Sequence, residues 1–268
     1  MRSAFRFALA ALVLPSLVSA QQDLRARLRA AGTRTVAFSA RARPEVCGDG
    51  IRSYSDGLSG PRSRIYDGML LTHEPWDTRI APCEHGLVRV TVRVVEGTPS
   101  WLRTAAGPLP VLGDTVMDIG IVSAASAGEF LRALVRGGEG RVAVDAISPL
   151  VLIDSIPRWE ILAAAAADSS RIQRYRRRAS DLLARGAAST LGFEGAGDED
   201  DAASLRREAV YAIARSKDKN IDPVPQLLDI ARTNTHRDAR VAAMYQLGQL
   251  DDSRALAFFA TMLKPGSR

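Results

Sequence analysis

The stretch that decides the fold is HRDARVAAMYQLG, residues 236–248. Its core pattern, Arg-x-x-Ala-x-x-x-Leu-Gly, begins at Arg240 and places small and large apolar residues at helical spacing. Closely related patterns begin at Arg176 and Arg206, so that the three arginines are 30 and 34 residues apart. A repeat of this length predicts helical units that each bury an apolar face against a neighbour.

Helical spacing dominates the chain from about residue 120 onward. The first of these helices is predicted to begin at a cap, either Ser123 or Ser126 in a capping box with Glu129. Further helices are predicted at 141–154, 158–167, 171–186, 203–214, 222–231, 237–249 and 253–263. The second half of the chain is therefore expected to be entirely helical.

The first half has a different period. After a short predicted helix at 22–31, apolar and polar residues alternate, most clearly in LVRVTVRVV at 87–95. Alternation of this kind is typical of an antiparallel sheet with one face buried and one face wet. Residues 33–118 are thus expected to form a small antiparallel sheet.

The N-terminus has the features of a cleavable export signal. Arg2 and Arg6 precede an apolar run at 7–14, and Val18-Ser19-Ala20 offers the small residues that a signal peptidase requires. The apolar run is shorter than the roughly 20 residues that a membrane-spanning helix needs. The sequence therefore predicts cleavage after Ala20, a periplasmic or extracellular protein, and no stable membrane span.

The charge balance argues against a nucleic-acid partner. The formal net charge is +6 and the basic residues include only three lysines, but the charge is spread along the chain rather than gathered in one segment. Nucleic-acid binding requires positive charge clustered on one face. A protein partner is expected instead.

Two cysteines in an oxidising compartment predict one disulfide, Cys47–Cys83. The alternative is a metal site formed by these cysteines with His73 and His85. Structural zinc ligands come in close pairs two to four residues apart, and this set lacks two such pairs. The disulfide is favoured, and no metal is expected.

Few residues suggest catalysis. The chain has no phosphate loop, nucleophile elbow or dinucleotide fingerprint, so no catalytic residue and no cofactor is predicted. The alternative, an envelope enzyme or enzyme-associated subunit, would need its site around His73, Asp77, Glu84 and His85. If this alternative is right, the four side chains should converge in one pocket.

The best candidate for an anionic partner is an arginine run in the predicted helix 171–186. Arg171, Arg174, Arg177 and Arg178 are expected to face outward when the apolar residues of that helix turn inward. Such a surface would meet an acidic protein or polymer. The alternative is a face solvated beside Asp168 and Asp181.

Residues 236–248 resemble the first helix of a HEAT repeat, in which Asp and Arg precede a small residue and a Leu-Gly pair. More broadly, 120–268 is similar to exported bacterial HEAT-repeat proteins with a β-rich N-terminal portion, whose stretches resemble 44–50, 118–125 and 153–155 here. This resemblance implies a binding surface and carries over no catalytic residue. The chain departs from the family at 187–202, where a Gly-rich acidic stretch replaces the expected second helix.

Together these features predict an α+β fold in three parts. Residues 1–20 form the signal peptide, 21–118 a β-rich domain with one disulfide, and 119–268 a right-handed α-solenoid of HEAT-like repeats. The function implied is that of an exported, non-catalytic scaffold or protein-binding protein.

Overall fold

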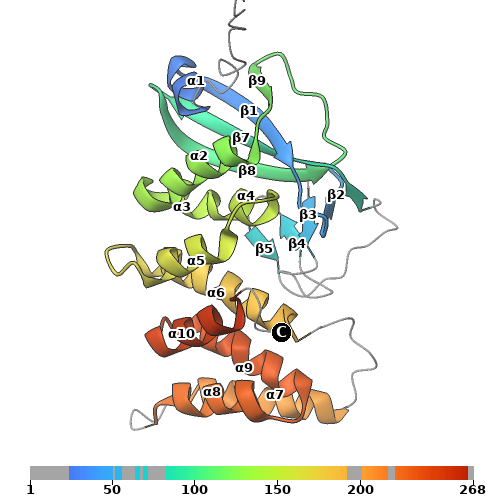
Figure 1. The fold of residues 1–268 in the computed structure, drawn as a ribbon, viewed down its shortest axis with the longest axis vertical. Coiled ribbons are helices and arrows are strands. Elements are labelled where there is room, and N and C mark those ends of the chain that lie inside the picture. The colour runs from blue at the N-terminus through green and yellow to red at the C-terminus, as the bar shows by residue number, and fades with distance from the viewer. Residues whose placement is uncertain are drawn as a thin grey trace, which may run out of the picture.

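The computed structural model shows a mixed α and β fold with the main sheet at one end and the helices extending away from it (Figure 1). It describes residues 24–50, 52–55, 64–66, 69–71, 83–191, 201–216 and 221–264, with the backbone alone at 52–55, 64–66, 69–71 and 201. The predicted signal peptide at 1–20 lies outside these residues. Within them, no helix combines the length and apolar character needed to cross a bilayer.

Two sheets are present in the described residues. A four-stranded sheet has the order β8-β7-β1-β9, and a second sheet has the order β5-β4-β3-β2-β6. The strands are β1 (Arg34–Arg41), β2 (Val46–Gly48), β3 (Arg52–Ser55), β4 (Arg64–Tyr66), β5 (Met69–Leu71), β6 (Glu84–His85), β7 (Leu87–Val95), β8 (Thr98–Gly107) and β9 (Val116–Ile121).

Alternation along β7 determines which face of the main sheet is buried. Val88, Val90, Val92 and Val94 have no solvent exposure, whereas the residues between them are partly or fully exposed. β1 pairs antiparallel with β7, and Phe38 lies opposite Val90. The prediction of a strand at 87–95 is confirmed residue for residue.

The expectation of a purely antiparallel sheet is wrong. β9 lies at the edge of the main sheet and pairs parallel with β1, so this sheet is mixed. The strand was missed because its alternation is broken: Gly120 has φ +85°, and the register shifts between Ala37 and Ser39 opposite it. β9 also spans the domain boundary predicted between residues 118 and 119.

The helices follow the predicted positions closely, except at 141–154, where two short helices replace one. Pro149 has no N–H to donate to the Asp145 carbonyl, which interrupts the helical ladder there. The helices are α1 (Leu24–Ala30), α2 (Ala124–Gly137), α3 (Gly140–Asp145), α4 (Ile147–Leu152), α5 (Arg158–Ala167), α6 (Gln173–Ser189), α7 (Asp201–Ala214), α8 (Pro223–Thr233), α9 (Arg237–Gln249) and α10 (Ser253–Met262).

α2 connects the sheet to the helical layer. Its N-cap is Ser123, whose side chain accepts a hydrogen bond from the Ser126 N–H; of the two predicted caps, Ser123 is therefore the one used. Phe130 of α2 meets Phe38 of β1 edge-on, with 5.9 Å between ring centroids. The buried apolar residues of the sheet and of the helices belong to one continuous core.

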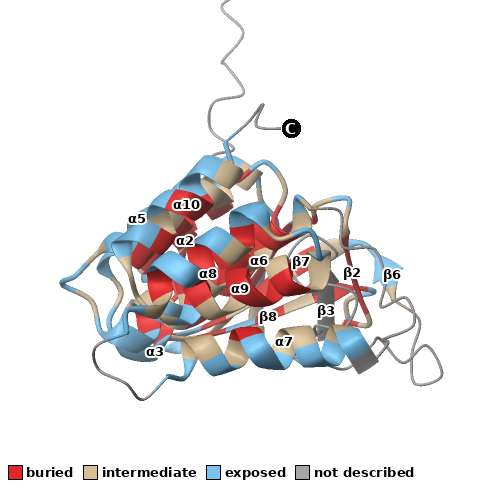
Figure 2. Ribbon diagram, turned by 90° about the horizontal axis from the view of Figure 1, so that it is seen from below, coloured by how far each residue is buried: buried red, intermediate tan, exposed pale blue. Residues whose placement is uncertain are grey.

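The last four helices do not stack in chain order. α6 packs on α5 and α9, whereas α7 packs on α8 and α9. Away from the sheet, the pairs therefore follow the order α5/α6, α10/α9, α8/α7, with the last pair in sequence lying between the other two (Figure 1). Viewed from the helical end, α9 carries much buried surface, whereas α7 is mostly exposed or half-buried (Figure 2).

A regular solenoid requires successive pairs to stack in sequence, and the described helices do not do so. α9 instead fits closely on α6. A Cβ added to Gly248 would lie only 2.7 Å from the Ala184 Cβ, so the two helices approach at their smallest residues. α7 has no glycine among the residues described in its range, and its Val210 is its one residue below a tenth exposed.

Candidate functional site

The disulfide Cys47–Cys83 is present and ties the second sheet together. Cys47 lies in β2, Cys83 immediately precedes β6, and their Cα atoms are 5.3 Å apart. β2 and β6 pair antiparallel, with Cys47 opposite His85. The crosslink therefore fixes the short strand β6 next to β2, and both cysteines are used as the sequence predicts.

The four residues of the enzyme alternative cannot be compared as a group. His73 and Asp77 lie outside the described residues. Glu84 and His85 are exposed on β6, where the His85 Nδ1 lies 2.9 Å from the Val46 carbonyl oxygen. Because a carbonyl only accepts, Nδ1 carries the hydrogen. His85 also lines an open hollow of about 250 Å³ beside Arg41 and Arg43.

The predicted arginine surface lies on the first turns of α6, with Arg171 two residues before the helix begins. Arg171 is only half-exposed because its Nη2 donates to the Val135 carbonyl at 3.0 Å, at the C-terminal end of α2. The Tyr175 hydroxyl donates to the same oxygen, and the Arg171 guanidinium lies 5.1 Å from the Tyr175 ring centroid. Arg171 thus holds α2 against α6.

Arg178 also turns inward rather than outward. Burial lowers its pKa from the usual arginine value, while the carboxylates of Asp181 and Asp145 act in the opposite direction. Asp145 itself, on α3, accepts from the Arg141 Nε at 3.2 Å. Arg178 is therefore part of a charged contact between α3 and α6.

Arg174 and Arg177 remain exposed, as predicted. Among the described residues neither has a carboxylate within ion-pair distance, and the carboxylates of Asp145 and Asp181 contact Arg141 and Arg185. Arg136 is likewise exposed, and it follows Val135, the residue whose carbonyl Arg171 binds. We call Arg136, Arg174 and Arg177 the basic face.

The arginine surface predicted from the sequence omitted Arg136 and included Arg171 and Arg178, whose roles are mainly structural. All four predicted arginines have outward-facing positions on an isolated helix. The Val135 carbonyl that Arg171 contacts lies on α2, 36 residues earlier in the chain, and one of the two carboxylates that act on Arg178, that of Asp145, lies on α3. Arg136 could have been found only from the contact between the end of α2 and the start of α6.

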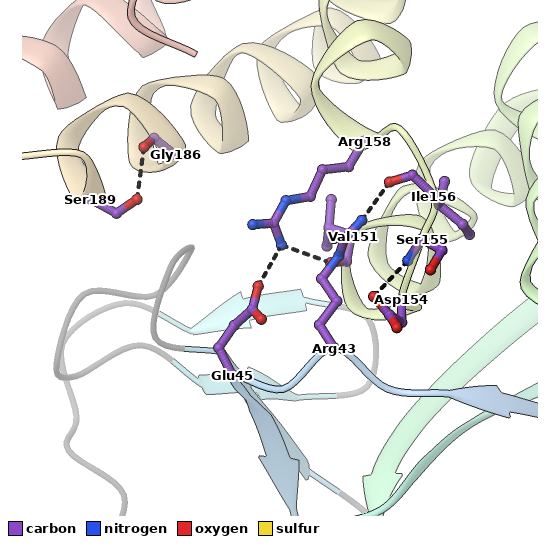
Figure 3. Close-up of polar contacts among 9 residues, drawn as sticks. All are labelled: Arg43, Glu45, Val151, Asp154, Ser155, Ile156, Arg158, Gly186 and Ser189. Carbon is purple, nitrogen blue, oxygen red and sulfur yellow. Dashed lines mark hydrogen bonds and ion pairs between the residues drawn. The ribbon is translucent and has the colours of Figure 1, made fainter. Parts of the chain in front are cut away.

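A second charged cluster joins the sheet to the helices (Figure 3). The Arg158 Nη1 lies 3.0 Å from the Glu45 Oε1, and the Arg43 Nε donates to the Val151 carbonyl at 3.1 Å. Arg158 contacts the same carbonyl at 3.3 Å. Both guanidinium groups therefore lie at the C-terminal end of α4, where positive charge is favoured.

Two cations share one carboxylate in this cluster. Burial and, second, the neighbouring Arg43 lower the pKa of Arg158 to about 10, although Glu45 opposes the change. The Arg158 guanidinium also lies 4.4 Å from the Trp159 ring centroid. That ring packs so closely on Gly186 that a Cβ there would be 2.3 Å from it. The cluster is packed on several sides and connects β2, α4, α5 and α6.

The described residues contain no group of three or more His, Cys, Asp or Glu side chains arranged to hold a metal ion. No protein-family model, curated protein or solved structure matches the chain.

Proposed function

We propose that this is an exported, non-catalytic protein that uses the basic face to bind an acidic segment of a partner protein. The observation that carries the proposal is the exposure of Arg136, Arg174 and Arg177, while Asp145 and Asp181 pair with Arg141 and Arg185. Fixed guanidinium groups form paired hydrogen bonds with carboxylates, which favours an acidic partner. α6 holds two of the three on one rigid helix.

Export is part of this proposal. It is supported by the charged, apolar and small-residue segments of residues 1–20 and by the disulfide, which persists in oxidising compartments. Expression of the full chain in a bacterial host, followed by N-terminal sequencing of the exported product, tests it. A product that begins at Gln21 is expected, and retention of Met1 would contradict export by cleavage.

The relationship to HEAT repeats also remains a proposal, and it concerns the individual helical units, because the described pairs do not stack in the sequential order of the predicted right-handed solenoid. It is supported by the contacts of two motif arginines with neighbouring helices. Arg206 of α7 binds Asp238 of α9 with 2.8 Å between Nε and Oδ2, and Arg240 of α9 donates to the Ala231 carbonyl of α8 at 3.1 Å. Each arginine holds a neighbouring helix, as expected of repeated units.

The binding proposal is tested with the charge-reversed variant R174E/R177E. The probe is a fluorescein-labelled peptide of alternating Glu and Asp, and the readout is fluorescence anisotropy. The full chain is expected to bind the peptide, and binding should weaken as salt screens the charges. R174E/R177E is expected to lose this binding.

The matched control is R34E/R93E, which changes the net charge equally at two exposed arginines of the main sheet. It should bind the peptide nearly as well as the unaltered protein. Equal losses in both variants would mean that overall charge, rather than the basic face, attracts the peptide. Unchanged binding by R174E/R177E would overturn the proposal.

A further inference from the structure

A hollow of about 160 Å³ lies on another part of the molecule, between α1, the turn joining β7 to β8, and α2. Its lining differs from that of the basic face, because most of it is apolar. The lining residues are Arg25, Leu28, Arg29, Gly97, Pro99, Phe130 and Leu134.

The walls of this hollow are fixed in place. The Gly97 N–H donates to the Gly32 carbonyl at 3.2 Å, and the Glu96 N–H donates to the Thr33 Oγ1 at 3.0 Å. Gly97 has φ +75°, which lets the turn lie against the end of α1. Since the strand turn and the helix are joined by these bonds, the hollow is preformed.

The floor is equally rigid. Leu28 and Phe130 are 1% and 3% exposed, and Phe130 is held by its edge-on contact with Phe38. On the other side, the Arg25 Nη2 donates to the Glu129 carbonyl at 3.3 Å, which ties α1 to α2. An apolar ligand would therefore meet a surface that needs little rearrangement to receive it.

The two charged residues of the lining are both basic. Arg25 and Arg29 contribute two guanidinium groups, and the lining has no acidic side chain. Arg29 is exposed, and it makes no ion pair with any described residue. The rim therefore favours an anionic group next to whatever occupies the apolar floor.

The size of the hollow limits that occupant. A cavity of about 150 Å³ lined by Leu, Ile and Phe holds benzene. The present hollow, at about 160 Å³, therefore has room for one aromatic ring or one branched alkyl group. A long acyl chain would extend beyond the hollow.

We propose that this hollow binds a small carboxylic acid that bears one compact apolar group. The apolar group packs on Leu28, Phe130 and Leu134, and the carboxylate lies at the rim beside Arg29 and Arg25. This site does not use the basic face, so the proposal of a bound carboxylic acid can be tested independently of the proposed partner binding.

The test is an NMR titration of the ¹⁵N-labelled protein with 3-phenylpropionate. Saturable shifts are expected at the backbone amides of α1, α2 and residues 96–99. The uncharged 3-phenylpropanamide has the same ring and should bind about tenfold more weakly, because it lacks the charge-assisted contact with arginine.

Two variants, R29Q and L134F, test the contributions of the rim and of the floor separately. R29Q should bring the affinity for 3-phenylpropionate close to that for the amide, while R93Q, at an exposed arginine of the main sheet, should leave it unchanged. L134F adds a ring to the hollow and should abolish binding of both compounds. An unchanged spectrum outside the hollow shows that each variant is folded.

Three results would overturn the proposal. Shifts that do not saturate would mean that the hollow is no binding site. Equal affinity for acid and amide, unaffected by R29Q, would remove the role of the carboxylate. Tighter binding of the peptide acetyl-Gly-Gly-Phe than of 3-phenylpropionate would identify the occupant as the C-terminus of a polypeptide instead of a small acid.

Discussion

Arg176 of α6 forms a two-pronged ion pair with Asp251, which lies 75 residues later between α9 and α10. The Nε donates to Oδ1 at 3.1 Å, and Nη2 donates to Oδ2. Arg176 is the first arginine of the repeated pattern, and its partner belongs to the last helical pair of the chain. The ion pair therefore holds the pair α9 and α10 against α6, so that this pair lies between α6 and the pair α7 and α8.

Removing either side chain of this ion pair is expected to lower the midpoint of thermal unfolding. D251N is the best variant on the acidic side, because Asp251 has φ +52° and asparagine tolerates that backbone conformation. R176M removes the charge on the other side while keeping an unbranched side chain. In the double variant R176M/D251N the loss should be smaller than the sum of the two single losses, as measured by circular dichroism. Strictly additive losses would show that the pair does not couple α6 to α10.

The close contact between Gly248 and Ala184 predicts that a substitution at Gly248 destabilises the protein and that a second substitution at Ala184 restores part of the stability. G248A places a Cβ 2.7 Å from the Ala184 Cβ and should destabilise the protein by about 1–3 kcal/mol in urea unfolding. G248A/A184G removes the clashing methyl group and should recover part of that loss.

The control is G137A, at the end of α2, where an added Cβ meets no atom within 4 Å. Its effect should stay within about 0.5 kcal/mol, as for most surface substitutions. A G248A variant as stable as G137A would mean that α6 and α9 are not closely packed at this point.

These contacts also show which parts of the fold the sequence could predict. Strand β7 and most helices were predictable because their apolar residues follow a period of 2 or 3.6 within a few turns. The order of the helical pairs was not, because it depends on contacts such as Arg176–Asp251 that join distant segments. The repeated pattern is the same in each pair and does not indicate which pair is adjacent.

The candidate site was predictable to a similar extent. Arg174 and Arg177 were predicted to be exposed, and they are. Arg171 and Arg178 are of the same residue type, yet Arg171 bonds to the Val135 carbonyl of α2, and burial lowers the pKa of Arg178. Charge spacing along one helix cannot reveal partners on another helix.

Reduction of the Cys47–Cys83 disulfide is expected to lower the free energy of unfolding by about 3–4 kcal/mol. The crosslink closes a loop over a separation of 36 residues, which restricts the unfolded chain. Urea unfolding with and without a reductant measures the difference. The variant C47A/C83A should be equally destabilised and should no longer respond to the reductant; a response that persists would point to another effect of the reductant.

Asp222 should make stability sensitive to acid. The Arg254 side chain, and then the Val224 N–H, hold the pKa of this carboxyl below its usual value. Its contribution is therefore complete above the unfolded pKa of about 3.9 and is lost as the pH falls through the lower folded pKa. In D222N, the fall in the unfolding midpoint between pH 6 and pH 3 should be smaller than in the unaltered protein.

Asparagine still caps a helix, so D222N keeps the start of α8 intact. D229N, at an exposed position of the same helix, is the matched control and should leave the pH dependence unchanged. The Arg254 Nη1 and the Asp222 Oδ2 are 2.7 Å apart. If D222N and D229N show the same pH dependence of the unfolding midpoint, this ion pair contributes nothing to acid sensitivity.

Glu45 should matter more to stability than the arginine that it contacts. The Arg158 side chain is 13% exposed and the Glu45 side chain 29%, and Arg43 lies beside them (Figure 3). E45A leaves two neighbouring cations without their carboxylate and should cost about 2–3 kcal/mol in urea unfolding, somewhat less than a fully buried pair. R158M removes one cation and retains apolar contact, so that its cost should be smaller. Because the harm in E45A comes from the unpaired charge, E45A/R158M should be more stable than E45A alone. A double variant less stable than E45A would show instead that Arg158 stabilises the junction through its contacts with Val151 and Trp159 rather than through Glu45.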